Sequence, residues 1–533
     1  MPLLGVVAAP LTLTAGPVTS LNLLMWLAFP LSATSMFLVL RRWTSWTPAA
    51  FAGGLLYGFS PYMFGQSTAH LHLLFVPLPP LIMLAVIELF VRRRGHPRRW
   101  GVALGILAAG QFLISSEVLA TTALVVVIGL AVLALARPGD VAPALRFAGG
   151  GLLCGLAVIL VALAYPTWVF FTGPEHYTAS AITGNAFAVR SDLLGPLLPT
   201  SLERLVPSGW AAYGDKLTPF GDYSENGSYL GLPLLLLLAY LGARSWADRW
   251  IRFGTLMALM TFVLSLGSPL AIDGHPTRIP LPDALLGHVP LIDQLLPSRI
   301  SLFTALFVGA VVALSLDRFR RTNPSRPTRE ASHVGDPDRG RTAQRLQRAV
   351  VLLVAAVATA ALLPRWPNRT VSTDVPSYFT SSDVDRIPLG TVALTYPYAT
   401  PLHAQPMVWQ AVTGMRFSLT GGYALIPDAR GVPTLFPSTL QPATVQHFFI
   451  NEAGGVPFYA SPPVADNATL VTDVRHFIHR YRIGVVLVDP ATPNSKTVEQ
   501  LVRRTLGRTP VARGGMDVWY DVQAASALTV PAS

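Results

Sequence analysis

The sequence contains one cysteine, Cys154, and only two lysines, Lys216 and Lys496. A single cysteine excludes a disulfide framework, a cysteine-based zinc site and a redox pair within one chain. Charged residues are also scarce: they make up 13% of this chain, whereas a soluble protein has about 25%. In their place the chain has long apolar runs, and its mean hydropathy is +0.47. This combination predicts a polytopic α-helical membrane protein.

The net charge of +11 does not indicate a nucleic-acid partner. The cations lie in short gaps beside apolar runs, as the positive-inside bias of membrane proteins requires. They form no basic face with interleaved aromatic residues. The sequence also has no internal repeat, P-loop, GxGxxG or HExxH motif. We therefore expect membrane lipids, and no nucleic acid, as partners.

About ten apolar segments are candidates for membrane spans. A span needs about 20 residues to cross the ~30 Å hydrocarbon layer, and several of these segments are shorter, which predicts broken or re-entrant helices. The predicted spans are Val18–Leu40, Pro48–Phe64, Leu71–Val91, Trp100–Ile114, Val118–Ala136, Phe147–Pro166, Tyr229–Leu241, Phe253–Leu266, Ile300–Leu316 and Ala349–Leu363.

Basic residues fall in every second gap between these segments. Because inner loops collect Lys and Arg, we expect the basic gaps to be cytoplasmic. They are Arg41-Arg42, Arg92 to Arg99, Arg137 to Arg146, Arg244 to Arg249 and a polar inner loop at about 317–348. The alternate gaps, at 65–70, 115–117, 167–228 and 267–299, have few cations for their length and are predicted to lie outside.

The same alternation places Met1 outside the membrane, because the first span, Val18–Leu40, runs toward Arg41-Arg42. No segment before that span could carry Met1 across. We therefore expect at least one further span, and the outer loop after it, to precede this reading frame.

Residues 364–533 have the composition of a soluble domain, which the charge alternation places outside the cell. Val471–Tyr481 and Thr497–Leu506 are predicted helices. Thr391–Tyr396, Ile483–Asp489 and Met516–Val522 are predicted strands. We expect a multi-span domain, residues 1–363, followed by an extracytoplasmic α/β domain.

Glu117 is the sharpest candidate for chemistry. It lies between two apolar runs, in Ile114-Ser115-Ser116-Glu117-Val118. An ionisable group at membrane depth costs roughly 2.5–3.5 kcal/mol on insertion scales, so its presence indicates a functional or structural role. Glu117 is either a general base, a metal ligand or an anchor for a substrate hydroxyl, or else a carboxylate in water at the tip of a hairpin.

His70 and His72 stand at a predicted outer membrane edge. Either could bind a diphosphate or move a proton near neutral pH, and the alternative is a pair of interfacial histidines. Their spacing is weak support for a metal site, since no third ligand is close in the sequence.

The long outer loop, about 167–228, is rich in ionisable and aromatic residues. Aromatic rings stack on sugars, and carboxylates bind sugar hydroxyls and divalent metals. The same composition suits an amphipathic loop at the membrane surface. The residues concerned are Glu175, His176, Arg190, Asp192, Glu203, Arg204, Asp215, Lys216, Asp222 and Glu225, with Trp168, Trp210, Tyr213 and Tyr223.

Arg299 opens a span from the cation-poor side, in Leu295-Leu296-Pro297-Ser298-Arg299-Ile300. A guanidinium there can bind a lipid phosphate through two parallel hydrogen bonds. The alternative is an arginine that only reaches toward the membrane surface.

Several stretches, in this order, resemble bacterial membrane proteins of the type-C glycosyltransferase superfamily, in their actinobacterial-like branches. The likeness spans nearly the whole chain. The stretches are Met1-Pro2-Leu3-Leu4-Gly5, Gly54-Leu55-Leu56-Tyr57-Gly58-Phe59-Ser60-Pro61-Tyr62, Gln111-Phe112-Leu113-Ile114-Ser115-Ser116-Glu117, Ser191-Asp192-Leu193-Leu194, Glu225-Asn226-Gly227-Ser228-Tyr229-Leu230-Gly231, Trp409-Gln410 and Gly421-Gly422-Tyr423.

The resemblance implies an enzyme of the bacterial plasma membrane that takes a sugar from a polyprenyl-phosphate donor at the outer face and transfers it to a glycan or lipid acceptor. By location, Glu117, Asp192 and Glu225 fit catalytic roles. The expected substrate- or phosphate-binding residues are His70, His72, Arg190, Arg299 and Asp222. The sequence does not decide whether a divalent cation takes part. Relatives of this kind have an acidic outer loop before the stretch that matches Met1-Pro2-Leu3-Leu4-Gly5.

Two other classes of function stay open. A lipid-glycan transporter or flippase would show repeats in matching halves, and none is visible. A non-catalytic scaffold for envelope assembly would tolerate replacement of Glu117 and of the loop carboxylates.

Overall fold

The computed structural model describes residues 1–68, 70–173, 189–217, 222–289, 292–322, 353–365, 374–401, 403–423, 426–427, 433–434, 442–454 and 462–523. The chain forms two compact units. The first comprises Met1–Ala9, Leu21–Tyr165 and Gly184–Arg369, and the second comprises Pro10–Ser20, Pro166–Thr183 and Thr370–Ser533.

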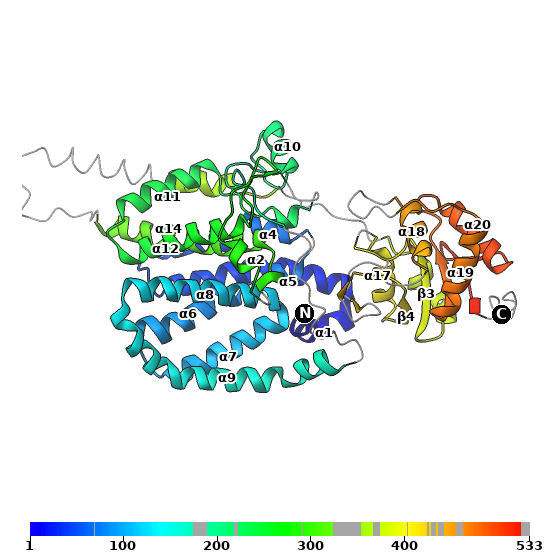
Figure 1. Ribbon diagram of the computed structural model, residues 1–533, viewed down its shortest axis with the longest axis horizontal. Helices are drawn as coiled ribbons and strands as arrows, with labels where there is room; N and C mark the ends of the chain where they lie inside the picture. The colour runs from blue at the N-terminus through cyan, green and yellow to red at the C-terminus, as the bar shows by residue number, and fades with distance from the viewer. Residues whose placement is uncertain are drawn as a thin grey trace, which may run out of the picture. The chain divides into compact units, whose positions relative to one another are not determined.

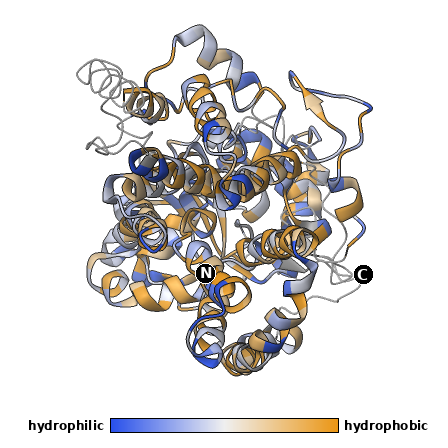
Figure 2. Cartoon of the chain, turned by 90° about the vertical axis from the view of Figure 1, so that its left-hand side faces the viewer, coloured by the Kyte–Doolittle hydropathy of each residue, from blue (hydrophilic) through white to orange (hydrophobic). Residues whose placement is uncertain are grey.

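Helices predominate among the described residues up to 322 (Figure 1). Hydrophobic residues cover much of these helices (Figure 2). The longer helices are α1 (Pro2–Ala15), α2 (Pro17–Leu40), α3 (Thr47–Gly58), α6 (Leu78–Val86), α7 (Pro97–Ile114), α8 (Ser116–Ala136), α9 (Val141–Thr172), α10 (Ser208–Lys216), α11 (Leu232–Arg244), α12 (Arg249–Ser265) and α14 (Ser301–Thr322). The shorter ones include α4 (Pro61–Gln66), α5 (Leu71–Leu74), α13 (Asp283–Leu286), the π-helix η1 (Ile87–Arg92) and the one-turn 3₁₀ helices η5 (Tyr223–Glu225) and η7 (Pro297–Ile300).

Five of the described helical segments are long and apolar enough to cross a membrane. They are Pro17–Leu40, Leu71–Arg92, Ser116–Ala136, Pro138–Val169 and Pro297–Arg321. The chain is therefore a multi-pass membrane protein. Its orientation and the number of ten spans stay predictions.

The other predicted spans are shorter helices. Pro48–Phe64 is broken into α3 and α4, because Pro61 favours an extended backbone at Ser60, whose ψ is 159°. Trp100–Ile114, Tyr229–Leu241 and Phe253–Leu266 overlap the helices α7, α11 and α12. Ala349–Leu363 is helical over residues 353–361, and its first residues lie outside the described part, as does most of the predicted inner loop.

The first unit keeps the basic gaps at one end of its helices and the cation-poor gaps at the other. Ion pairs join the basic gaps to each other, and a separate network of contacts joins residues 66, 70, 117, 224, 225 and 299 at the opposite end. The pairs at the basic end are Arg42–Glu88 (3.7 Å), Arg93–Asp140 (3.1 Å) and Asp248–Arg318 (2.5 Å). The alternation read from the sequence thus corresponds to two ends of one bundle.

Glycines let the central helices approach closely. Helix α14 packs along α3, and a methyl group added at Gly53 would lie 2.6 Å from the carbonyl oxygen of Gly309. A second crossing joins α7 to α9, where an added Cβ at Gly105 would lie 2.5 Å from the carbonyl oxygen of Gly155. Small residues four apart on both helices are the usual device for such a crossing in membranes.

The second unit contains a five-stranded mixed sheet in the order β4-β3-β7-β9-β8. Strand β3 runs parallel to β4 and β7, while β9 is antiparallel to β7 and β8. The strands are β3 (Thr391–Tyr396), β4 (Phe417–Leu419), β7 (Ile483–Val488), β8 (Val511–Arg513) and β9 (Met516–Trp519).

Helices cover both faces of this sheet. Helices α18 (Ala443–Glu452), α19 (Ala468–Arg480) and α20 (Ser495–Leu506) pack in one apolar cluster with Tyr396, Val486 and Val488. Helices α16 (Ser377–Thr380) and α17 (Gln405–Val412) pack in a second cluster with Val485 and Leu487. The α/β prediction is confirmed here, with the three predicted strands and both predicted helices present; β4 and β8 were not predicted.

Candidate functional site

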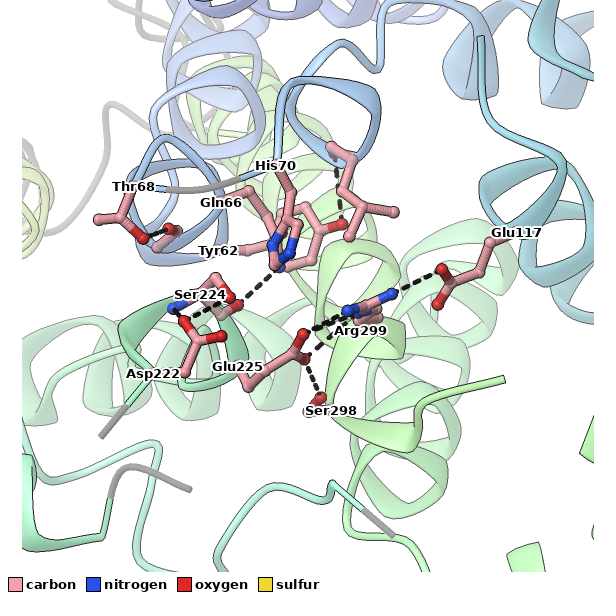
Figure 3. Close-up of polar contacts among 12 residues, drawn as sticks. Tyr62, Gln66, Thr68, His70, Glu117, Asp222, Ser224, Glu225, Ser298 and Arg299 are labelled. Atoms are coloured by element: carbon pink, nitrogen blue, oxygen red, sulfur yellow. Dashed lines mark hydrogen bonds and ion pairs between the residues drawn. The ribbon is translucent and has the colours of Figure 1, made fainter. Parts of the chain in front are cut away.

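Arg299 lies between two carboxylates inside the first unit (Figure 3). Its Nη1 donates to Glu117 Oε2 at 2.6 Å. On the other side its Nε and Nη2 donate to Glu225 Oε1 at 2.9 and 2.5 Å. The side chains of Arg299, Glu117 and Glu225 are only 14%, 22% and 6% exposed. We call these three residues the Arg299 cluster.

Each member stands at the beginning or the end of a helix. Glu117 is in the first turn of α8, where Ser115 caps the helix by accepting a hydrogen bond from the Val118 amide. A carboxylate is favoured there because the helix N-terminus carries partial positive charge. Arg299 belongs to η7, the turn that leads into α14, and Glu225 ends η5.

The turn that carries Glu225 is itself firmly held. Asp222 caps η5, since its Oδ1 accepts hydrogen bonds from the amide and the hydroxyl of Ser224 at 2.9 and 2.6 Å. Gln66 Nε2 donates to the Ser224 carbonyl at 2.6 Å. At Gly65 of α4 an added Cβ would lie 2.7 Å from the Tyr223 carbonyl oxygen, so this approach requires glycine. Asp222 therefore positions Glu225 and does not touch Arg299 in the described structure.

The two histidines lie on the same side of the bundle. His70 Nδ1 is 3.2 Å from Gln66 Oε1, which extends the chain of polar contacts from Ser224 to His70 (Figure 3). Burial, and then the Arg299 charge, lower the pKa of His70, so that it is neutral at pH 7. The His72 ring meets the His70 ring edge-on, with centroids 5.6 Å apart. His70 thus joins the network as a neutral group, and among the described residues His72 contacts the network through the His70 ring.

The electrostatics of the Arg299 cluster do not match a free phosphate-binding arginine. One guanidinium faces two carboxylates, so the ionised cluster carries a net charge of −1. Glu117 Oε1 is buried and makes no hydrogen bond of normal geometry with the described residues. A buried acceptor without a partner is costly, so this oxygen is suited to accept a proton, a hydroxyl or a cation.

Asp192 and Arg190 are not joined to the Arg299 cluster by any hydrogen bond or ion pair within the described ranges. Asp192 is buried and accepts backbone hydrogen bonds from Leu194 (2.9 Å), Asp273 (3.2 Å) and Gly274 (2.8 Å). It thereby holds a turn in which Asp273 has φ +56°, a conformation that needs such support. Arg190 Nη1 donates to the Pro269 carbonyl at 2.9 Å. Their predicted roles in catalysis and binding stay predictions.

Sequence reasoning missed two members of the site. Ser298 Oγ donates to Glu225 Oε2 at 2.8 Å, and Gln66 connects η5 to His70. Both are fully buried polar residues in cation-poor gaps, which is the signal that could have found them. Glu175 and His176 lie outside the described residues.

The described residues contain no group of three or more His, Cys, Asp or Glu side chains arranged to hold a metal ion. Glu117 and Glu225 are the acidic pair at the site, and Arg299 lies between them. A divalent cation here would have to compete with the guanidinium.

Solved membrane-protein structures are similar to this chain at low identity. Arabinofuranosyltransferase AftD from mycobacteria matches with a TM-score of 0.47 and 15% identity, over 97% of this chain and 35% of AftD, so this chain spans about a third of that protein. ArnT from Cupriavidus metallidurans in the apo state matches with a TM-score of 0.42 and 14% identity, over 94% of this chain and 84% of ArnT. The same protein bound to undecaprenyl phosphate matches with a TM-score of 0.45 and 13% identity, over 96% and 86% of the two chains.

No curated protein matches the sequence. Residues 1–291, more than half of the chain, match the family described as a domain of unknown function, DUF6311, and they include Glu117, Glu225 and both histidines. The chain therefore belongs to the DUF6311 family.

Proposed function

We propose that this protein is a membrane glycosyltransferase. It moves a sugar from a polyprenyl-phosphate-type lipid donor to a glycan or lipid acceptor of the cell envelope, at the outer face of the bacterial plasma membrane. The observation that carries the proposal is the buried Arg299 cluster, which combines a guanidinium with a carboxylate oxygen, Glu117 Oε1, that makes no hydrogen bond of normal geometry within the described part of the chain. The resemblance of the sequence to type-C glycosyltransferases supports the same reading.

The chemistry needs two groups, and the cluster offers both. The acceptor hydroxyl attacks the anomeric carbon, the bond from that carbon to the phosphate oxygen breaks, and the configuration inverts. Glu117 takes the hydroxyl proton through Oε1, the oxygen that does not bind Arg299. Arg299 stabilises the negative charge that grows on the departing phosphate. The products are the glycosylated acceptor and the lipid phosphate.

The position of the cluster suits a lipid donor. It joins the beginnings of two candidate spans, Ser116–Ala136 and Pro297–Arg321, at the end of the bundle opposite the arginine-rich gaps. With the positive-inside bias, that end faces outward. We assign the second unit to the outside for the same reason, where it can hold a glycan acceptor.

A deletion strain of the host bacterium tests the proposal. The strain should accumulate a lipid-linked sugar and lose one sugar from an envelope glycan, both measured by mass spectrometry. Wild-type protein and the Glu88→Gln variant should restore the glycan, whereas Glu117→Gln at equal protein level should not. Glu88 is a matched control, since it is a buried carboxylate paired with Arg92 at the far end of a span.

Unchanged lipid-linked sugars in the deletion strain would overturn the transferase assignment. Trapping of a lipid-linked glycan on the inner leaflet would instead identify a flippase. Full restoration by Glu117→Gln would remove Glu117 from the active site, as a non-catalytic scaffold requires.

A further inference from the structure

The two carboxylates around Arg299 are held very unequally. Glu225 receives hydrogen bonds from Nε and Nη2 of Arg299 and a third from Ser298 Oγ at 2.8 Å. Among the described residues, Glu117 receives one hydrogen bond of normal geometry, from Nη1 at 2.6 Å, and a further contact from the Leu296 backbone, while its Oε1 has no bond of normal geometry. Glu225 is 6% exposed and Glu117 is 22% exposed. Any ligand that competes for Arg299 would therefore displace Glu117 more easily than Glu225.

The surrounding backbone reinforces this difference. Glu225 ends a turn whose first residues are capped by Asp222. Gln66 of α4 donates a further hydrogen bond to this turn. Glu117 stands in the first turn of α8, beside backbone amides that can stabilise a carboxylate after it leaves Arg299. Rotation of the Glu117 side chain would therefore leave the backbone of α8 intact, whereas movement of Glu225 would break the turn.

The charge of the cluster favours such an exchange when the ligand is an anion. Each nitrogen of the Arg299 guanidinium already donates to a carboxylate, and with both carboxylates ionised the net charge of the cluster is −1. A phosphate that approached this arrangement would be repelled. Replacement of one carboxylate on the guanidinium removes this repulsion and gives the phosphate a charged donor.

We propose that Arg299 exchanges counter-ions: the phosphate group of the donor replaces Glu117 at Nη1, while Glu225 and Ser298 keep the guanidinium in place. The identity of the ligand as a lipid phosphate rests on the proposed function. The exchange frees the Glu117 carboxylate as a base only when donor is bound, which imposes the order donor before acceptor. It also keeps an active base away from water in the empty site.

Binding measurements without turnover test the exchange. The purified protein in lipid nanodiscs is titrated with undecaprenyl phosphate and, separately, with inorganic phosphate. Glu117→Gln removes the competing carboxylate and should tighten phosphate binding about tenfold. Glu225→Gln and the milder Ser298→Ala loosen the guanidinium and should weaken it, by about tenfold and about threefold. Glu88→Gln should match the wild type.

Two results would overturn the exchange. Weaker phosphate binding by Glu117→Gln would mean that Glu117 helps to hold the ligand. Equal tightening by Glu117→Gln and Glu225→Gln would mean that only total charge matters. Ser298→Ala keeps the test valid if Glu225→Gln fails to fold, because it changes one hydrogen bond alone and should still weaken binding.

The two probes separate the sources of the phosphate. Tighter binding of undecaprenyl phosphate than of inorganic phosphate assigns the ligand to a lipid headgroup, and equal affinity would overturn that assignment. The exchange and the proposed function also fail separately. The predicted order of affinities without sugar transfer by the wild type would refute only the transferase, whereas transfer without that order would refute only the exchange.

Discussion

At the scale of single residues, Arg299 is the position on which the site depends. Its side chain donates hydrogen bonds to two buried carboxylates that lie 182 and 74 positions away in the sequence. Sequence reasoning selected Glu117, Glu225 and Arg299 one by one, because each is an ionisable residue beside an apolar run. It could not pair them, since residues so far apart meet only through the tertiary fold.

Replacement of Arg299 separates its structural from its chemical role. Arg299→Gln leaves two carboxylates buried without their counter-ion, and we expect a loss of roughly 3–5 kcal/mol in the free energy of unfolding. Arg299→Lys keeps the charge and loses the paired hydrogen bonds to Glu225, so its unfolding temperature should fall less while sugar transfer falls at least tenfold. Thermal unfolding in detergent and a transfer assay measure the two effects. Equal unfolding temperatures for Arg299→Gln and the wild type would contradict this role.

Glu203 gives the first unit a pH-dependent stability. Burial raises the pKa of Glu203 from 4.5 to about 7, although Thr200 donates two hydrogen bonds to it at 2.6 and 2.9 Å. The folded protein therefore holds this proton between about pH 4.5 and 7 whereas the unfolded chain releases it, so stability falls as pH rises through that window and is level above it. Glu203→Gln should abolish this dependence and unfold at a higher temperature than wild type at pH 8. Parallel unfolding curves for both proteins from pH 4.5 to 8 would disprove it.

At the scale of helices and strands, apolar length and periodicity predicted most elements correctly. The strand Thr391–Tyr396 was predicted with its observed bounds from its short apolar run. The three-residue strands β4 and β8 were missed, since so few residues show no period. The close approach of α7 and α9 was also missed, although glycines at 101 and 105, and at 151 and 155, share the spacing of a tight helix crossing.

Adjacent glycines of α9 provide a matched test of that crossing. An added Cβ at Gly151 would lie 2.5 Å from the Pro97 carbonyl oxygen, whereas at Gly150 it meets nothing within 4 Å. Gly151→Ala should therefore lower the free energy of unfolding by about 1–3 kcal/mol. Gly150→Ala should leave it unchanged or raise it by up to ~1 kcal/mol, since alanine favours helix. Equal unfolding temperatures for the two variants would show that the helices do not touch at Gly151.

At the scale of the whole molecule, the alternation of arginines predicted two chemically different ends. The contacts of the first unit agree with it, because arginines of the basic gaps form ion pairs with carboxylates at one end and the Arg299 cluster forms at the other. The count of ten spans could not be derived from the alternation, and five of the described helical segments are long and apolar enough to cross a membrane. Prolines and short apolar helices break the simple relation between an apolar run and a span.

Cysteine labelling tests the orientation. The chain has one native cysteine, Cys154, and a Cys154→Ala background allows single new cysteines to be introduced. Leu389→Cys, at a position that is 80% exposed in the second unit, should react with a membrane-impermeant maleimide on intact cells. Arg94→Cys, in the basic gap, should react only after permeabilisation. The reverse pattern would put the Arg299 cluster on the cytoplasmic side.

The measurement that tests the account most directly is sugar transfer by the purified protein. Nanodiscs are supplied with undecaprenyl phosphate that carries a radiolabelled sugar, drawn from host membranes, and with host envelope glycan as acceptor. The account predicts that wild type and Glu88→Gln move label to the glycan and release undecaprenyl phosphate, while Glu117→Gln is slower by roughly 100-fold or more. Transfer by Glu117→Gln at the wild-type rate would contradict the assignment of the Arg299 cluster as the catalytic site.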